Sequence, residues 1–149
     1  MTDKRRATDH VDIINLEARY VMCWDQADGD GWADVFTPDG VFEVVPVGNR
    51  APFAARGRQE LAKFCAGFNS KYIGVHLPSL PYIEVAGDEA TGHVNFHFVA
   101  IGRLAAAHTT TRTATGHYRV RYRRTGGGWR MAHRLEKPMV SAKDEFFDY

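Results

Sequence analysis

The stretch YVMCWDQADGDGWADVFTPDG, residues 20–40, decides how the chain is interpreted, because it joins an apolar helical pattern to the first strand. The acidic residue Asp25 stands at the end of the apolar part, and Gly29, Asp30 and Gly31 follow soon after it. A carboxylate that merely ends a helix carries little information, whereas one that points into a core is costly unless it has a partner. The direction of Asp25 is therefore the first question.

Helical periodicity extends from Thr8 to about Ala27, and Asp9 is suited to cap the first turn. At about 100° per residue, apolar side chains cover most of the helix circumference. The polar arc contains Asp12, Asn15, Arg19 and Gln26. The pattern predicts a helix that is buried on most of its sides.

Asp25 falls outside that polar arc, between the directions of Ile14 and Ala18, and Glu17 lies in the apolar sector as well. Two interpretations stay open. The helix can fray before the glycines, so that Asp25 turns to water or caps Gly29. Alternatively, the helix persists and Asp25 is a buried carboxylate with a partner.

The rest of the chain predicts a second short helix, one isolated strand, a third helix and then a meandering sheet. The helices are expected at Trp32–Phe36 and Gln59–Phe68, the isolated strand at Val41–Val45, and four further strands within 76–88, 89–103, 113–124 and 128–139. Helices first and antiparallel strands afterwards are typical of an α+β domain.

Composition limits the class of protein. The chain has 149 residues, of which 44% are hydrophobic and 25% charged, which predicts one domain at 1–149, with a folded core at about 8–140 and a C-terminal tail at 141–149. Nineteen basic residues against 18 acidic ones give a formal net charge of +1, which argues against nucleic acid or an anionic membrane as partner. Cys23 and Cys65 lie in apolar helical patterns, and no signal-like apolar run follows the N-terminus, so we expect no disulfide and a soluble, cytoplasmic protein.

Three segments together carry a family resemblance: ARYVMCWDQADGDGWADVFTPDGVFE, HLPSLPYIEVAGDEATG and GHYRVRYRRTGGGWRMAHRLEKP. They resemble the SnoaL-like branch of the nuclear-transport-factor-two-like superfamily. Within it, the chain is most similar to the group of scytalone dehydratase, bacterial bile-acid dehydratase and the small subunits of ring-hydroxylating dioxygenases. The resemblance implies a cone-shaped α+β barrel, in which a curved, mostly antiparallel sheet wraps the N-terminal helices and leaves a pocket at the wide end.

The resemblance also implies catalytic residues. Asp25 matches the dehydratases' acid near the end of the first helix, His76 their histidine at the start of the next strand, and Tyr20 the bile-acid-type tyrosine five residues before the acid. The chain departs from scytalone dehydratase at Trp24, where that enzyme has a tyrosine, and its second catalytic histidine has no clear match.

These residues predict a cofactor-independent lyase (dehydratase) or isomerase with a dry pocket, acting on a polycyclic, steroid-like or polyketide molecule. His76 would be the general base, Asp25 would orient its ring, and Tyr20 would donate a hydrogen bond to a substrate oxygen. A second hypothesis stays open: a non-catalytic module that binds small molecules, or a structural subunit of a ring-hydroxylating dioxygenase.

An apolar lining suits such a ligand. The candidates for the pocket wall are Trp24, Phe42, Phe53, Phe64, Phe68, Phe96 and Phe98, together with Tyr118, which shares a strand face with Val120 and Tyr122. Neither a cofactor nor a metal is predicted. The resemblance implies a homo-oligomer, a dimer or trimer, that forms through the outer face of the sheet.

Two patterns that suggest metals are better explained otherwise. His93 and His97 lie roughly 13 Å apart if residues 89–103 form a strand, so one metal cannot bridge them, and we expect both on the face opposite Phe96. For His97, a place in the pocket wall remains open. The acidic loop DQADGDG lacks the ligand order of a calcium loop and predicts a turn between helices.

Alternating arginines predict a solvated outer sheet face. The row consists of Arg119, Arg121 and Arg123, with Arg112, Arg124, Arg130 and Arg134 nearby. Because the aromatic residues of this strand alternate onto the other face and the net charge is almost zero, this row does not indicate a nucleic-acid surface.

Overall fold

The computed structural model describes residues 3–46, 51–102 and 111–139. In chain order the elements are α1 (Asp3–Asp25), α2 (Gly29–Asp34), β1 (Phe36–Val44), β2 (Phe53–Arg56), α3 (Gly57–Asn69), β3 (Tyr72–Pro78), β4 (Tyr82–Ala86), β5 (Glu89–Gly102), β6 (Thr111–Thr125) and β7 (Gly128–Met139). The tail predicted at 141–149 lies outside the described residues.

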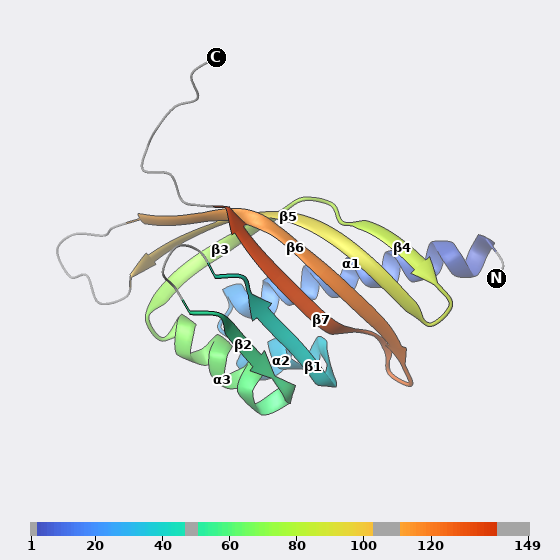
Figure 1. The fold of residues 1–149 in the computed structure, drawn as a ribbon, viewed down its shortest axis with the longest axis horizontal. Helices are drawn as coiled ribbons and strands as arrows, with labels where there is room; N and C mark the ends of the chain where they lie inside the picture. Colours follow the sequence, from blue (N-terminus) through green and yellow to red (C-terminus); the bar gives the residue numbers. More distant parts are fainter. Residues whose placement is uncertain (1–2, 47–50, 103–110, 140–149) are drawn as a thin grey trace, which may run out of the picture.

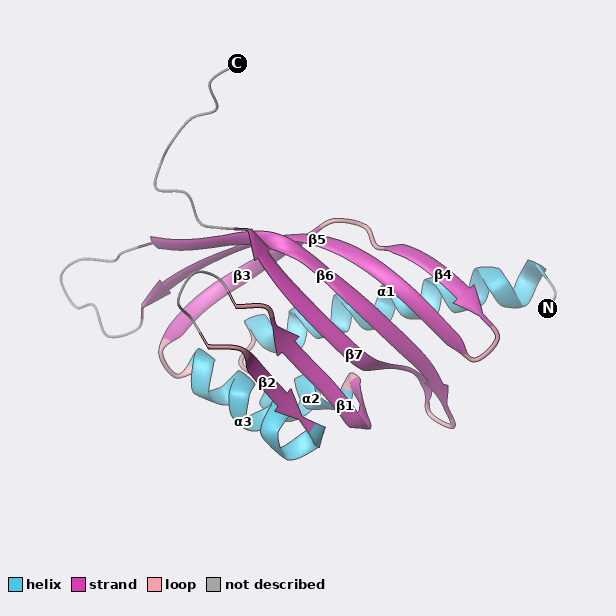
Figure 2. Ribbon diagram, viewed as in Figure 1, coloured by secondary structure: helices cyan, strands magenta, loops and turns pink. Residues whose placement is uncertain are grey.

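The seven strands form one strongly curved sheet in the order β2-β1-β7-β6-β5-β3, and β4 also pairs with β5. All pairs are antiparallel except β1 with β7, which is parallel. Figures 1 and 2 show α1 running behind the sheet, and α3 packs against β1 and β2. The α+β class with helices packed on a curved, mostly antiparallel sheet is confirmed, and the sheet stays open.

The long helix begins and ends differently from the prediction. It starts at Asp3, so Asp9 lies inside the helix rather than at its N-cap; Asp9 is 1% exposed and accepts hydrogen bonds from Arg124 and from the Trp129 indole. At the other end, Ala27 has φ 60, and the amides of residues 27 and 28 donate to the carbonyls of residues 24 and 23. This Schellman turn ends the helix at Asp25 and rules out fraying before it.

Several other boundaries also differ. The short helix starts at Gly29 because the side chain of Asp28 accepts a hydrogen bond from the Gly31 amide, and β1 starts at Phe36 rather than Val41. The strand β2 was not predicted. The strand expected within 76–88 is in fact two strands, β3 and β4, separated by residues 79–81. Pro78 and Pro81 lie at the two ends of this interruption, and proline lacks the backbone N–H that a sheet requires.

A β-bulge in β7 determines which of its side chains face inward. Arg121 pairs with His133 while Tyr122 pairs with Met131, so Ala132 has no partner in the ladder. An extra residue reverses the alternation of side chains beyond it. After the bulge, Arg134 therefore points inward and is 0% exposed, which corrects its predicted place on the outer face.

The two faces of β6 are as predicted. Tyr118, Val120 and Tyr122 are buried, whereas Arg119, Arg121 and Arg123 are exposed. On β5, His93 is exposed and stacks on His117 at 4.8 Å between ring centroids. His97 is half-buried and does not line the cavity described below.

Within the described ranges, no helix combines the length and apolar character needed to cross a membrane. Among the same residues, no group of three or more His, Cys, Asp or Glu side chains is placed to hold a metal ion. Cys23 and Cys65 are both buried free thiols.

Candidate active site

A cavity of about 870 Å³ opens between the helices and the concave face of the sheet. All eight residues predicted for the pocket wall line it, and so do Tyr20 and His76. They come from α1, α3 and five strands, so the cavity exists only in the folded chain. The remaining lining residues are Val44, Val45, Pro46, Ala51, Tyr72, Ala100, Arg112, Thr113, Ala114, Glu136, Pro138 and Met139.

Asp25 and His76 meet at the end of α1. One carboxylate oxygen of Asp25 lies 2.8 Å from His76 Nδ1, and the other accepts a hydrogen bond of 3.0 Å from the His76 backbone amide. Their side chains are 18% and 7% exposed. The same carboxylate therefore fixes both the ring of His76 and the position of β3.

This contact defines which ring nitrogen is available. A carboxylate only accepts, so Nδ1 carries the proton, and in the neutral form of the ring Nε2 has the lone pair. Among the described residues, Nε2 has no hydrogen-bond partner, and the ring packs on Phe98 at 4.4 Å and near Trp24 at 6.1 Å between centroids. An acid at the C-terminal end of a helix opposes the helix dipole, so the His76 contact offsets an unfavourable position.

Tyr20 lies beside this pair. Its ring centroid is 6.4 Å from that of His76 and 6.0 Å from that of Tyr118. Burial raises the pKa of the Tyr20 hydroxyl, and the positive charge of Arg134 opposes this only in part. The hydroxyl therefore keeps its proton at any ordinary pH and is a hydrogen-bond donor.

A buried ion pair holds Tyr20 in place. The guanidinium of Arg134 lies between two rings, 3.9 Å from the centroid of Tyr20 and 3.8 Å from that of Tyr118. Its Nη1 donates to both carboxylate oxygens of Glu17 at 2.8 Å, and the Tyr122 hydroxyl donates to Glu17 at 2.6 Å. The apolar-sector position of Glu17 was the one sequence signal for this network; nothing predicted its partner.

Glu136 was missed as well. It stands two residues after Arg134 on the inward face of β7 and lines the cavity. Burial raises its pKa to about 7, and the charge of Arg134 opposes the rise. No sequence pattern indicated it, because the alternation before the bulge places it on the outer face.

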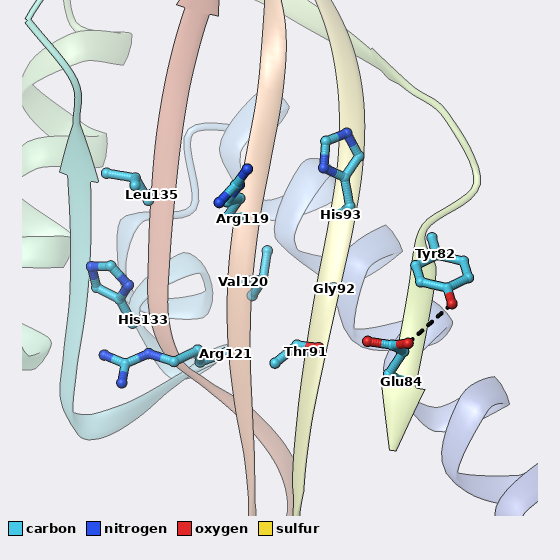
Figure 3. A pocket seen from close by; sticks show the side chains of 10 residues that line it. All are labelled: Tyr82, Glu84, Thr91, Gly92, His93, Arg119, Val120, Arg121, His133 and Leu135. Atoms are coloured by element: carbon cyan, nitrogen blue, oxygen red, sulfur yellow. Dashed lines mark hydrogen bonds between the residues drawn. The ribbon is translucent and has the colours of Figure 1, made fainter. Parts of the chain in front are cut away.

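A second, shallower hollow of about 470 Å³ lies on the outer face of the sheet (Figure 3). Its side chains include Tyr82, which donates to Glu84 at 3.1 Å, and His93, Arg121 and His133. As Figure 3 shows, the two histidines stand on strands separated by β6. His93 is exposed and His133 half-buried on this outer face, whereas the concave cavity is larger and lined by buried aromatic side chains, so the concave cavity is the candidate site.

Fold and cavity together define an α+β domain whose curved, open sheet has a ligand-sized cavity on its concave side. The model of the SnoaL-like domain matches residues 5–135, and the chain belongs to this family. A comparison with curated proteins gave no match.

Three solved structures illustrate the similarity. An aspartate-to-asparagine variant of a protein of unknown function from Mycobacterium tuberculosis is 30% identical, with a TM-score of 0.76 over 93% of this chain and 77% of that one. The beta subunit of a provisionally named aromatic-ring-hydroxylating dioxygenase from Novosphingobium aromaticivorans is 21% identical, with a TM-score of 0.71 over 94% of each chain. A provisionally named dehydratase from Streptomyces avermitilis is 16% identical, with a TM-score of 0.73 over 91% and 99%. The last two show the fold alone.

Proposed function

We propose that this protein is a cofactor-independent dehydratase or isomerase that acts by general acid-base chemistry on an apolar, oxygenated small molecule of polycyclic, steroid-like or polyketide type. The observation that carries the proposal is the Asp25–His76 contact of 2.8 Å at the wall of a large aromatic cavity. A histidine held by a carboxylate, with its second nitrogen unpaired in an apolar setting, is the arrangement of an oriented general base.

In the proposed reaction, His76 Nε2 removes a proton from the carbon next to a substrate carbonyl. The electron pair moves onto the carbonyl oxygen, where the Tyr20 hydroxyl donates a hydrogen bond, and Asp25 stabilises the imidazolium. In a dehydration, the enolate expels a neighbouring hydroxide, which takes the proton from His76 and leaves as water. In an isomerisation, the proton returns to a different carbon. Both outcomes share the first step.

The shared step gives a direct test. A panel of aromatic ketones with and without a β-hydroxyl would be incubated in D2O, and loss of the α-proton signal would be followed by proton NMR. We expect His76→Ala to slow exchange by roughly 10²- to 10⁴-fold, the usual contribution of a general base. Asp25→Asn should also slow it, because the ring loses its orienting partner.

The outer face supplies a matched control. His133 Nε2 lies 2.8 Å from a carboxylate oxygen of Glu43, the same type of pair without the cavity. His133→Ala should leave exchange unchanged. Exchange that survives both His76→Ala and Asp25→Asn, or that falls equally in His133→Ala, would refute the proposed mechanism.

The second candidate is a binding or structural subunit, favoured by the similarity in fold to a dioxygenase beta subunit. Exposed apolar side chains on and between β3 and β4, among them Val75 (52%), Leu77 (60%) and Leu80 (85%), provide a surface on which another chain can pack. We also propose that the chain forms a homo-oligomer, to be checked by sedimentation at micromolar concentration. A monomer that is inactive on the whole panel and becomes stable only with a large oxygenase subunit would favour this second candidate.

A further inference from the structure

The mechanism above does not use one polar group of the cavity wall, the carboxyl of Glu136. It points inward from β7, beyond the bulge at Ala132, and pairs across the sheet with Tyr118. Among the described residues, its carboxyl forms no hydrogen bond and no ion pair at 4 Å or less. A partly buried carboxyl with free hydrogen-bonding capacity at a cavity wall is unusual, because such groups are normally satisfied by the protein.

The surroundings of Glu136 favour its neutral form. On its own strand, Arg134 supplies a positive charge that acts on Glu136, but that guanidinium is bound to Glu17. The neighbouring strand β6 contributes Tyr118, and helix α1 contributes Tyr20. On the other side of β7, the apolar Val44 of β1 pairs with Glu136. Farther along the cavity wall, the titratable and charged groups are those of Tyr72, His76 and Arg112.

Burial outweighs the nearby positive charge and raises the pKa of Glu136 to about 7. The carboxyl is therefore largely protonated below neutral pH. A protonated carboxyl is a hydrogen-bond donor, and its partner has to come from the contents of the cavity.

We propose that Glu136 is a ligand-recognition group, whose protonated carboxyl donates a hydrogen bond to a neutral carbonyl oxygen of the bound molecule. The cavity would then prefer ketones over hydrocarbons of the same shape. An ammonium ligand is disfavoured, because it would need an ionised carboxyl and would lie near the guanidinium of Arg134. The inference rests on the proposed use of this cavity as the ligand site, but it requires no turnover.

Three naphthalene probes of nearly equal size can test the proposal: 2-acetylnaphthalene, 2-isopropylnaphthalene and 1-(2-naphthyl)ethylamine. Their affinities would be measured by isothermal titration calorimetry at pH 5.5 and pH 8.5. At the lower pH we expect the ketone to bind roughly three- to tenfold more tightly than the hydrocarbon, as one hydrogen bond allows. At the higher pH, Glu136 is ionised and no longer donates, so the ketone preference should fall. What remains is the preference that results from the hydrogen bond of Tyr20, whose hydroxyl stays protonated.

Two variants isolate the carboxyl. Glu136→Gln keeps a donor that does not titrate, so the ketone preference should be the same at both pH values. Glu136→Leu lacks a donor, so the preference should drop at pH 5.5 to the wild-type value at pH 8.5. His76→Asn, in contrast, should retain the pH dependence of the wild type.

The outcomes separate this inference from the proposed function. If the hydrocarbon and ketone bind equally at pH 5.5, or if the pH dependence survives in Glu136→Gln, the role of Glu136 is wrong while the cavity remains a ligand site. Tighter binding of the amine than of the ketone would also overturn it. If no probe binds to any form of the protein, both the inference and the proposed use of the cavity fail.

Discussion

Replacing Arg134 with methionine should destabilise the protein severely. The cost would come from the unpaired charge of Glu17 rather than from empty space, because methionine fills much of the volume of the arginine side chain. The change leaves the carboxylate of Glu17, a residue that is 5% exposed, with the Tyr122 hydroxyl as its one remaining partner among the described residues. Breaking one side of a buried ion pair typically costs about 3–5 kcal/mol, and the two ring contacts of the guanidinium are lost as well. For a chain of this length, that corresponds to a fall in Tm of roughly 10–15 °C.

The same geometry predicts that removing the whole network costs far less. Nε and Nη2 of Arg134 are buried and have no hydrogen-bond partner among the described residues. The contacts of the ion pair therefore do not fully offset the free energy that is lost when Arg134 and Glu17 leave water. A triple variant, Glu17→Leu with Tyr122→Phe and Arg134→Met, removes both charges of this network together with the hydroxyl that bonds to them. We expect its free energy of unfolding to lie within about 1 kcal/mol of the wild-type value.

The assay is urea unfolding at pH 7.5, followed by far-UV circular dichroism, for the wild type, the three single variants and the triple variant. Non-additivity is the decisive quantity, because residues of one network do not contribute independently. A cost below about 1 kcal/mol for Arg134→Met, or a triple variant that loses the sum of the single costs, would show that the charges are not interdependent.

Two further predictions concern stability. Because the pKa of Glu136 is raised from 4.5 to about 7, the folded chain holds a proton that the unfolded chain loses, so the free energy of unfolding should fall as pH rises through this interval, by at most about 3 kcal/mol. Glu136→Gln should abolish this fall in urea titrations at pH 5 and 8, and an unchanged slope would contradict the assigned burial. In Gly92→Ala, the new Cβ would lie 2.6 Å from the Tyr122 hydroxyl, which should cost about 1–3 kcal/mol, whereas Gly67→Ala in α3, with open space around it, should add up to about 1 kcal/mol. Equal thermal shifts for the two alanine variants would refute the packing argument.

Most of the order of elements could be predicted because it depends on local periodicity, and the same periodicity supplied the interpretation of Asp25 that the structure bears out, one of the two left open. A helix wheel stays valid up to the last turn, and the Schellman turn at Ala27 lets the helix persist to Asp25. The aromatic residues of the cavity were predicted from the family resemblance and from their apolar character. Their catalytic and binding roles stay predictions.

What could not be predicted depends on pairing between distant segments. The strand Phe53–Arg56 is short and has no alternation of its own, and it forms because β1 offers an edge. The inward direction of Arg134 and Glu136 follows from the register of β7 against β6, which no local pattern specifies. The sequence therefore did not indicate that Glu136 lines the cavity or that Arg134 lies beneath its tyrosines.

The two carboxylate–histidine pairs show why residue types alone did not define the site. Asp25 with His76 and Glu43 with His133 have the same separation of 2.8 Å. The first pair adjoins a large apolar cavity, whereas the second lies on the outer face beside the exposed Arg56. The surroundings, rather than the pair itself, distinguish a candidate base from an ordinary surface contact.

The bulge at Ala132 decides which side chains of β7 face the concave side of the sheet. If β7 kept all its residues but lost the bulge, strict alternation from Met131 would turn His133 and Leu135 towards the cavity and Arg134 and Glu136 towards water. Deleting Ala132 would instead place His133 directly after Met131 and keep Arg134 and Glu136 inward. A relative with the same residues in this strand but no bulge would thus present the opposite side chains of β7 to its cavity. Sequence comparisons within the family therefore need to align the inward-facing positions of β7 before residue types are compared.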